Sequence, residues 1–170
     1  SSNHDECITP VEAVLPLLEF LREYKDKIIW CPFDKDYSNF VKILKNQGFT
    51  VINSHIDYGQ DFYNYEPPQW DIIVSNPPFT NKRKIFERCL KFGKPFALIM
   101  TNIWLNDRAP WEIFGEDLQL LALKDRINFL DNGGNRLGKP SFGSSYYCYK
   151  LLPKQICVRE LNYSKEFKND

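Results

Sequence analysis

The sequence of 170 residues predicts one α/β domain, with a mostly parallel twisted sheet, one antiparallel late strand and helices on both faces. Three observations support this fold class. Short apolar runs rich in β-branched residues recur, prolines or polar loops end them, and segments with helical spacing separate the early runs. A strand, a helix and a strand in so few residues form a βαβ unit, whose right-handed crossover gives parallel pairing.

The composition limits the classes of function. Lysine plus arginine total 22, as do aspartate plus glutamate, so any phosphate contact must come from a local basic patch. The five cysteines are widely spaced without a C-x-x-C, so we expect no metal site, no disulfide framework and a cytoplasmic location. No apolar run approaches ~18 residues, so we expect no membrane contact. We expect residues 1–170 to form one domain without a separate target-recognition domain, with flexible ends at 1–4 and 160–170.

The first predicted helix begins near Thr9. Thr9 has the side chain of an N-cap, Pro10 suits the first helical position, and Glu12 completes a capping box. Pro16 is expected to kink this helix or to confine its regular part, because proline lacks an N–H and its ring crowds the preceding turn.

The next segments predict a βαβ unit. A buried strand is expected over 27–33, ended by Pro32, and a second strand over 49–54. Between them, acidic and hydroxyl side chains favour a helix start near Ser38, and Gly48 provides the C-cap.

The middle of the chain contains a long loop and a third buried strand. Residues 55–69 show no helical stripe, so we predict a loop with one short strand near Asp61 and Phe62. Four aromatic residues in this loop indicate that it covers another part of the molecule. The strand from Trp70 then ends abruptly at Asn76, where an Asn-Pro-Pro-Phe stretch begins.

The second half predicts further elements. Thr80 or Asn81 is expected to cap a helix that ends at Gly93. After it we expect, in order, a buried strand over 95–100, a short helix near Pro110, one or two strands over 118–123 and 126–130, a turn-rich loop over 131–139, an antiparallel strand over 144–152 and a short strand after Pro153.

The Asn-Pro-Pro-Phe loop suits the binding of a planar amine. The Asn76 side-chain oxygen and the Pro77 carbonyl can accept both hydrogens of an exocyclic amino group, as on adenine. These two acceptors localise the nitrogen lone pair, which makes the amine a better nucleophile in the transition state. Phe79 offers a flat face for a base, worth roughly 1–3 kcal/mol of stacking. The simpler interpretation is that the stretch is only a stiff strand-to-helix turn.

Together these motifs resemble the S-adenosylmethionine-dependent N6-adenine methyltransferases, and above all small members from bacteria and phages. The resemblance covers about residues 5–153, and it includes 126–129 and 141–144, which resemble a late hairpin beside the target base. It implies a Rossmann-like methyltransferase domain with S-adenosyl-L-methionine as cofactor. By this resemblance the catalytic residues are Asn76, Pro77, Pro78 and Phe79, and the cofactor-binding residues are Thr9, Pro10, Cys31, Pro32, Phe33, Asp34, Lys35, Ser38, Asn39, His55, Asp61 and Phe62.

The loop after the first strand departs from the family pattern. The usual loop is glycine-rich, whereas this chain has no glycine between Cys31 and Asn39. Either side chains such as that of Asp34, which can hold an ammonium group, replace the glycines, or cofactor binding is weakened. The acidic residue that normally follows the second strand is also missing, and His55 or Asp57 lies nearest. A lone histidine there is more often structural than a ligand.

The expected partner is nucleic acid, with DNA favoured over RNA. Five cations are expected to contact its phosphate backbone: Lys82, Arg83, Lys84, Arg136 and Lys139. For the first three, a basic face that is merely solvated is an equally good explanation. A partner subunit or a homodimer is a further way to supply target specificity. The alternatives are a methyltransferase for cytosine N4 or a protein glutamine amide, and a non-catalytic binding module that has lost the cofactor.

Overall fold

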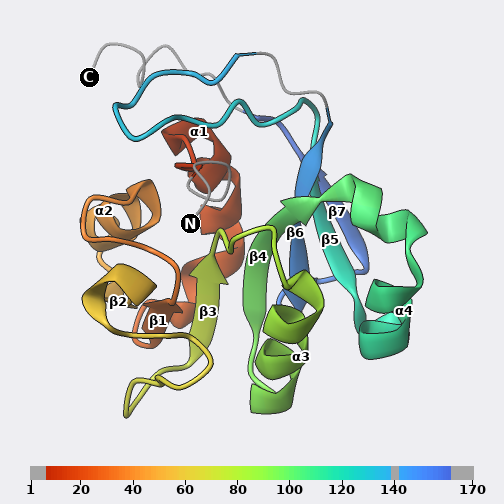
Figure 1. The fold of residues 1–170 in the computed structure, drawn as a ribbon, viewed down its shortest axis with the longest axis horizontal. Helices are drawn as coiled ribbons and strands as arrows, with labels where there is room; N and C mark the ends of the chain where they lie inside the picture. Colours follow the sequence, from red (N-terminus) through yellow and green to blue (C-terminus); the bar gives the residue numbers. More distant parts are fainter. Residues whose placement is uncertain (1–6, 139–141, 162–170) are drawn as a thin grey trace.

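The computed structural model describes residues 7–138 and 142–161, and a seven-stranded sheet is its centre. The strands are β1 Ile28–Cys31, β2 Thr50–Asn53, β3 Ile72–Ser75, β4 Phe96–Thr101, β5 Gln119–Leu123, β6 Ser144–Tyr149 and β7 Ile156–Arg159. Their order is β2-β1-β3-β4-β6-β5-β7 (Figure 1). Only β6 runs antiparallel to its neighbours, so the prediction of a mostly parallel sheet with one antiparallel late strand is confirmed.

Helices cover both faces of the sheet, as predicted. The α-helices are α1 Val11–Val14, α2 Asn39–Asn46, α3 Lys82–Phe92 and α4 Arg108–Phe114, and the 3₁₀ segments are η2 Leu15–Tyr24, η3 Ile56–Tyr58, η4 Asn102–Asn106 and η5 Gly115–Asp117. Successive residues of a strand point to opposite faces. Ile29 therefore packs in one core cluster with α1, η2 and α2, while Trp30 packs in a second with α3 and α4.

The strands β1 and β3 end where their sequences predict. Every residue of β3 is buried, which suits a strand covered on both faces. The prolines that follow β1 and β3 cannot continue the hydrogen-bonded ladder. Because β1 and β3 are parallel neighbours, their carboxyl ends lie at the same end of the sheet, and the loops that follow them lie side by side.

The first helix differs from its prediction. Pro10, not Thr9, is the N-cap residue, and no side chain caps the helix, so the expected capping box is absent. The α-helical part ends at Val14, and a 3₁₀ segment that contains Pro16 follows. The expectation that Pro16 confines the regular helix is confirmed.

The predicted strand over 126–130 is wrong. Both edges of β5 are occupied, by β6 and by β7, so this stretch cannot pair with the strand that precedes it. Instead it leaves the sheet and crosses above α1 (Figure 1). Leu130 forms isolated bridges with Ile8 and with Arg136.

The loop over 55–69 contains η3 and turns, so the short strand predicted near Asp61 and Phe62 is also wrong. The Asp61 carboxylate accepts a hydrogen bond from Tyr63 N at 3.1 Å, which favours a turn over an extended strand. The expectation that the loop covers another part of the molecule is confirmed, because Phe62 and Tyr65 pack against the buried Trp30.

The remaining elements lie close to their predicted positions. The helix α3 begins after Asn81, although the Asn81 side chain makes no capping bond, and it ends at Gly93 with φ +71°. The helix α4 begins two residues before Pro110. No helix in the described part of the chain is long and apolar enough to span a bilayer.

Phe86 tests the packing of the second core cluster. It is 0% exposed and contacts the rings of Phe96, Trp104 and Tyr147. Phe86→Ala should lower the free energy of unfolding by roughly 3–5 kcal/mol, because the cavity left behind cannot fully close. Urea unfolding measures the loss. The control is Leu137→Ala, at a side chain that is 55% exposed, and it should change stability by less than about 0.5 kcal/mol. Equal losses of stability in Phe86→Ala and Leu137→Ala would contradict this packing.

Candidate active site

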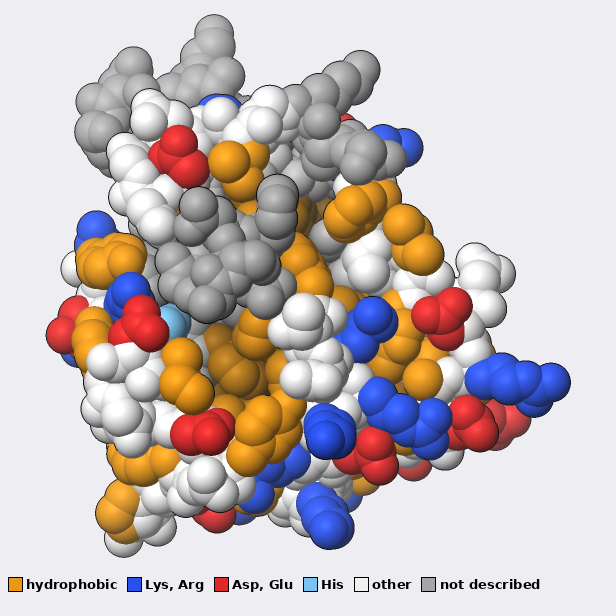
Figure 2. Space-filling view, in the orientation of Figure 1, with side chains coloured by type: hydrophobic (Ala, Val, Ile, Leu, Met, Phe, Trp, Pro, Cys, Tyr) orange, Lys and Arg blue, Asp and Glu red, His pale blue; other side chains and the backbone are white. Residues whose placement is uncertain are grey.

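A cavity of about 300 Å³ lies at the carboxyl ends of β1 and β3. The strand β1 has β2 on one side and β3 on the other, so the strand order changes direction between β1 and β3. In open α/β sheets ligands bind at such a switch point, outside the carboxyl ends of the strands. Figure 2 shows a hollow lined by apolar side chains on this face, with charged side chains around it.

The structure brings most of the predicted site residues to this cavity. Those that line it are Thr9, Pro32, Phe33, Asp34, Lys35, Ser38, His55, Asp61, Phe62, Asn76 and Pro78. The lining does not include Pro10, Cys31, Asn39, Pro77 and Phe79. Cys31 is a fully buried core residue, and Phe79 packs partly buried against the second core cluster, so it does not present its ring to the cavity.

Asp34 connects three elements at the base of the cavity. Its Oδ1 accepts a hydrogen bond from Ser38 Oγ at 2.6 Å, and its Oδ2 accepts one from Ser75 Oγ at 2.5 Å. Ser38 is the N-cap of α2, and Ser75 is the last residue of β3. The carboxylate therefore holds the first loop, the start of α2 and the end of β3 together, and its remaining lone pairs can still accept from a ligand.

Burial leaves this carboxylate without a compensating positive charge. Asp34 is 7% exposed, and both of its side-chain partners are neutral hydroxyl groups. Burial raises the pKa of Asp34 from 3.8 to about 6, although the hydrogen bonds from Ser38 and Ser75 oppose the shift. A cationic group placed beside it would stabilise the charged form, so the site favours a ligand that carries an ammonium group.

Asn76 presents an acceptor without a partner. Its Nδ2 donates to the main-chain carbonyl of Cys7 at 3.3 Å, which fixes the amide. Its Oδ1 is buried and has no hydrogen-bond partner among the described residues, and the same holds for Thr9 Oγ1. Both residues line the cavity. Asn102 Oδ1 and Asn128 Oδ1 are also buried without a partner, but these residues lie outside the lining. Buried polar atoms are costly when unpaired. The Asn76 oxygen can only accept, whereas the Thr9 hydroxyl can donate or accept, so the cavity offers hydrogen-bonding groups to a polar ligand.

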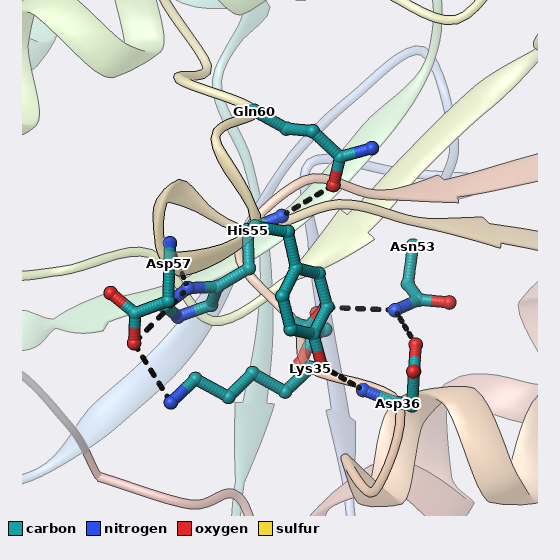
Figure 3. A network of polar contacts seen from close by, with 8 residues as sticks. Lys35, Asp36, Asn53, His55, Asp57 and Gln60 are labelled. Atoms are coloured by element: carbon teal, nitrogen blue, oxygen red, sulfur yellow. Dashed lines mark hydrogen bonds and ion pairs between the residues drawn. The ribbon is translucent and has the colours of Figure 1, made fainter.

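A network of polar contacts orders the rim of the cavity beside β2 (Figure 3). Lys35 Nζ lies 2.8 Å from a carboxylate oxygen of Asp57, and Asn53 Nδ2 donates to Asp36 Oδ1 at 2.7 Å. His55 Nδ1 accepts from Asp57 N at 3.0 Å, so the imidazole caps η3. His55 thus has a structural role in addition to its place in the lining, whereas Asp57 is exposed, pairs with Lys35 and does not line the cavity.

The predicted phosphate-binding cations are not equivalent. Arg83 lies 3.3 Å from Glu87 and 3.2 Å from Glu112, so surface carboxylates already compensate its charge. Arg136 forms an ion pair with Glu12. Lys84 is exposed and Lys82 half-buried, and no ion pair joins either lysine to another described residue. Lys139 lies outside the described residues.

Several lining residues are not among the predicted site residues. They are Cys7, Ile8, Tyr37, Ile56, Tyr63, Thr80, Asn81, Ile85 and Asn132. Some adjoin predicted residues, as Ile8 adjoins Thr9 and Tyr63 adjoins Phe62, so a wider window around each motif would have included them. Asn132 reaches the cavity only because a distant loop crosses above α1, and no local pattern predicts that contact.

Comparison with known protein families and with curated proteins finds no match to this chain. The geometry of the cavity therefore carries the functional argument.

The raised pKa of Asp34 predicts a pH-dependent stability. Between pH 3.8 and about 6 the folded state holds the proton that the unfolded state has lost, so the contribution of Asp34 falls as the pH rises. Relative to Asp34→Asn, the wild type should lose about 1 kcal/mol of unfolding free energy between pH 5 and 7.5. Urea unfolding of both proteins at the two pH values measures this. A difference that stays constant with pH would show that Asp34 titrates normally.

Proposed function

We propose that this chain is an S-adenosyl-L-methionine-dependent methyltransferase with a Rossmann-like fold, which transfers a methyl group directly to the N6 amine of adenine in nucleic acid, preferably DNA. The observation that carries the proposal is the buried oxygen of Asn76. This atom has no partner among the described residues, and Asn76 itself lines the cavity directly after β3. An acceptor held in this way suits the hydrogens of a planar amine.

The residues of the cavity fit the proposed cofactor. The cavity volume of about 300 Å³ lies at the lower end of the range for small-molecule sites. Asp34 would hold the ammonium of the methionine part, and the Thr9 hydroxyl, which has no partner among the described residues, would donate to its carboxylate. Phe33 and Phe62 have ring centroids 4.9 Å apart and supply an apolar wall for the adenine of the cofactor. These side chains take the place of the missing glycines after β1.

The chain itself would contribute positioning and polarisation. When bound, S-adenosyl-L-methionine supplies an electrophilic methyl group on a sulfonium, so no covalent enzyme intermediate is needed. Asn76 Oδ1 accepts an N–H of the target amine, which localises the nitrogen lone pair as the nitrogen approaches the methyl carbon. We still propose the Pro77 carbonyl as the acceptor for the second hydrogen of the amine. The bound cofactor would give up its methyl group and leave as the neutral thioether, and the amine would release its excess proton to solvent. The main gain is alignment of the reacting atoms.

A nucleic-acid substrate would require exposed cations near the cavity. Of the predicted cations Lys84 suits this role best, because it is exposed in the first turn of α3, the helix that follows the Asn-Pro-Pro-Phe loop. In duplex DNA the adenine must also leave the stack, at a cost of a few kcal/mol. Tyr37 and Tyr63 line the cavity and are 49% and 41% exposed, so their rings are available to aromatic groups at its mouth.

Asn76→Ala tests the proposal. The variant should reduce methyl transfer to DNA on the order of a hundredfold or more, because it removes the acceptor that acts on the amine in the transition state. Radiolabelled methyl transfer to unmethylated DNA, with tRNA and protein extracts in parallel, measures the rate and the substrate class. Asn46→Ala, at an exposed position at the end of α2, is the control and should keep the wild-type rate.

The outcomes separate the proposed activity from its alternatives. Transfer to protein alone, or to cytosine alone, would replace adenine as the substrate. Transfer that is unaffected by Asn76→Ala would contradict the role of Asn76. Failure of the wild-type protein to methylate any of the three substrates, while the fold is intact, would favour a non-catalytic binding module.

A further inference from the structure

The orientation of the Asn76 amide depends on a residue far away in the sequence. An asparagine side chain has two ends of nearly equal size, one an acceptor and the other a donor. If the amide turned over, Nδ2 would take the place of Oδ1 and would repel the hydrogens of a target amine. The main-chain carbonyl of Cys7 can only accept, and it lies 3.3 Å from Nδ2. This contact admits the amide in one orientation, in which Nδ2 donates to Cys7 and Oδ1 remains the acceptor for a ligand.

We propose that the main-chain carbonyl of Cys7 is a positioning group for Asn76, and that the pairing of Ile8 with Leu130 holds this carbonyl in place. The inference rests on the proposed function only for its effect on rate. No residue of the Asn-Pro-Pro-Phe loop supplies the contact, so the sequence around Asn76 does not by itself determine which end of the amide faces the cavity.

The segment that carries Cys7 is held by hydrogen bonds on both sides. Ile8 N donates to the Leu130 carbonyl, and Leu130 N donates to the Ile8 carbonyl, each at 2.9 Å. On the other side, Asn39 Nδ2 at the start of α2 donates to the Thr9 carbonyl at 2.9 Å. These bonds fix the main chain immediately after Cys7. Neither Leu130 nor Asn39 lines the cavity, so their effect on Asn76 must pass through this segment.

Leu130→Pro and Leu130→Ala form a matched pair of variants. Both substitutions remove the leucine side chain, but only proline also removes the main-chain N–H that donates to the Ile8 carbonyl. Asn39→Ala is a second variant that removes the donor to Thr9, in case Leu130→Pro does not fold. The first readout is the side-chain NH₂ signal of Asn76 in ¹H–¹⁵N NMR spectra, assigned by its absence in Asn76→Asp.

In the wild type and in Leu130→Ala we expect one Asn76 NH₂ signal at the same position. In Leu130→Pro the signal should shift or broaden, because the partner of Nδ2 is no longer fixed, while the main-chain signals of the sheet keep their positions. Asn39→Ala should change it in the same direction. An Asn76 signal that is unchanged in a folded Leu130→Pro and in Asn39→Ala would overturn the proposal.

The second readout is the rate of methyl transfer. Leu130→Pro should lower kcat about tenfold or more relative to Leu130→Ala, since small misplacements of a reacting group cost on the order of 10²-fold in rate. The KM for S-adenosyl-L-methionine should change less than kcat. Equal kcat values in the pair would overturn the proposal. If the wild type methylates no substrate, the proposed function fails, and the NMR comparison alone still decides whether Cys7 positions Asn76.

Discussion

The hydrogen-bonded carboxylate of Asp34 is the contact on which the arrangement of the site depends. Ser38 and Ser75 donate to its two oxygens, and these hydroxyls belong to the start of α2 and the end of β3. The contact therefore joins the loop after β1 to the end of β3, at the position where the strand order changes direction. The Asp34 carboxylate is also a buried negative charge beside the cavity with only neutral side-chain partners. The same group therefore stabilises the fold and favours a cationic ligand.

The second half of the site is assembled from segments that are distant in sequence. Asn76 leaves β3 on a loop stiffened by two prolines, and the N-terminal segment around Cys7 crosses to meet its amide. Leu130 holds that segment from a loop that crosses above α1 (Figure 1). The cavity is thus closed by contacts between the first and the last thirds of the chain, while the strands β1 and β3 supply a rigid base.

The sequence predicts the parts of this structure that depend on local physics. The ends of β1 and β3 follow from prolines after β-branched runs, and Asp34 and Asn76 were found because they stand at those ends. The strand expected over 126–130 failed because an apolar pattern does not reveal that β6 and β7 already occupy both edges of β5. The contribution of Asn132 to the lining was invisible for a related reason, since it depends on long-range pairing of the main chain.

Calorimetric titration with S-adenosyl-L-methionine tests whether the cavity beside Asp34 binds this cofactor through its ammonium group. We expect saturable binding to one site at pH 7.5, weakened about tenfold at pH 5, because Asp34 with a pKa of about 6 is then mostly protonated. In Asp34→Asn the affinity should be lower and independent of pH in this range. Absence of binding at both pH values, or an affinity of the wild type that does not change between them, would contradict the claim.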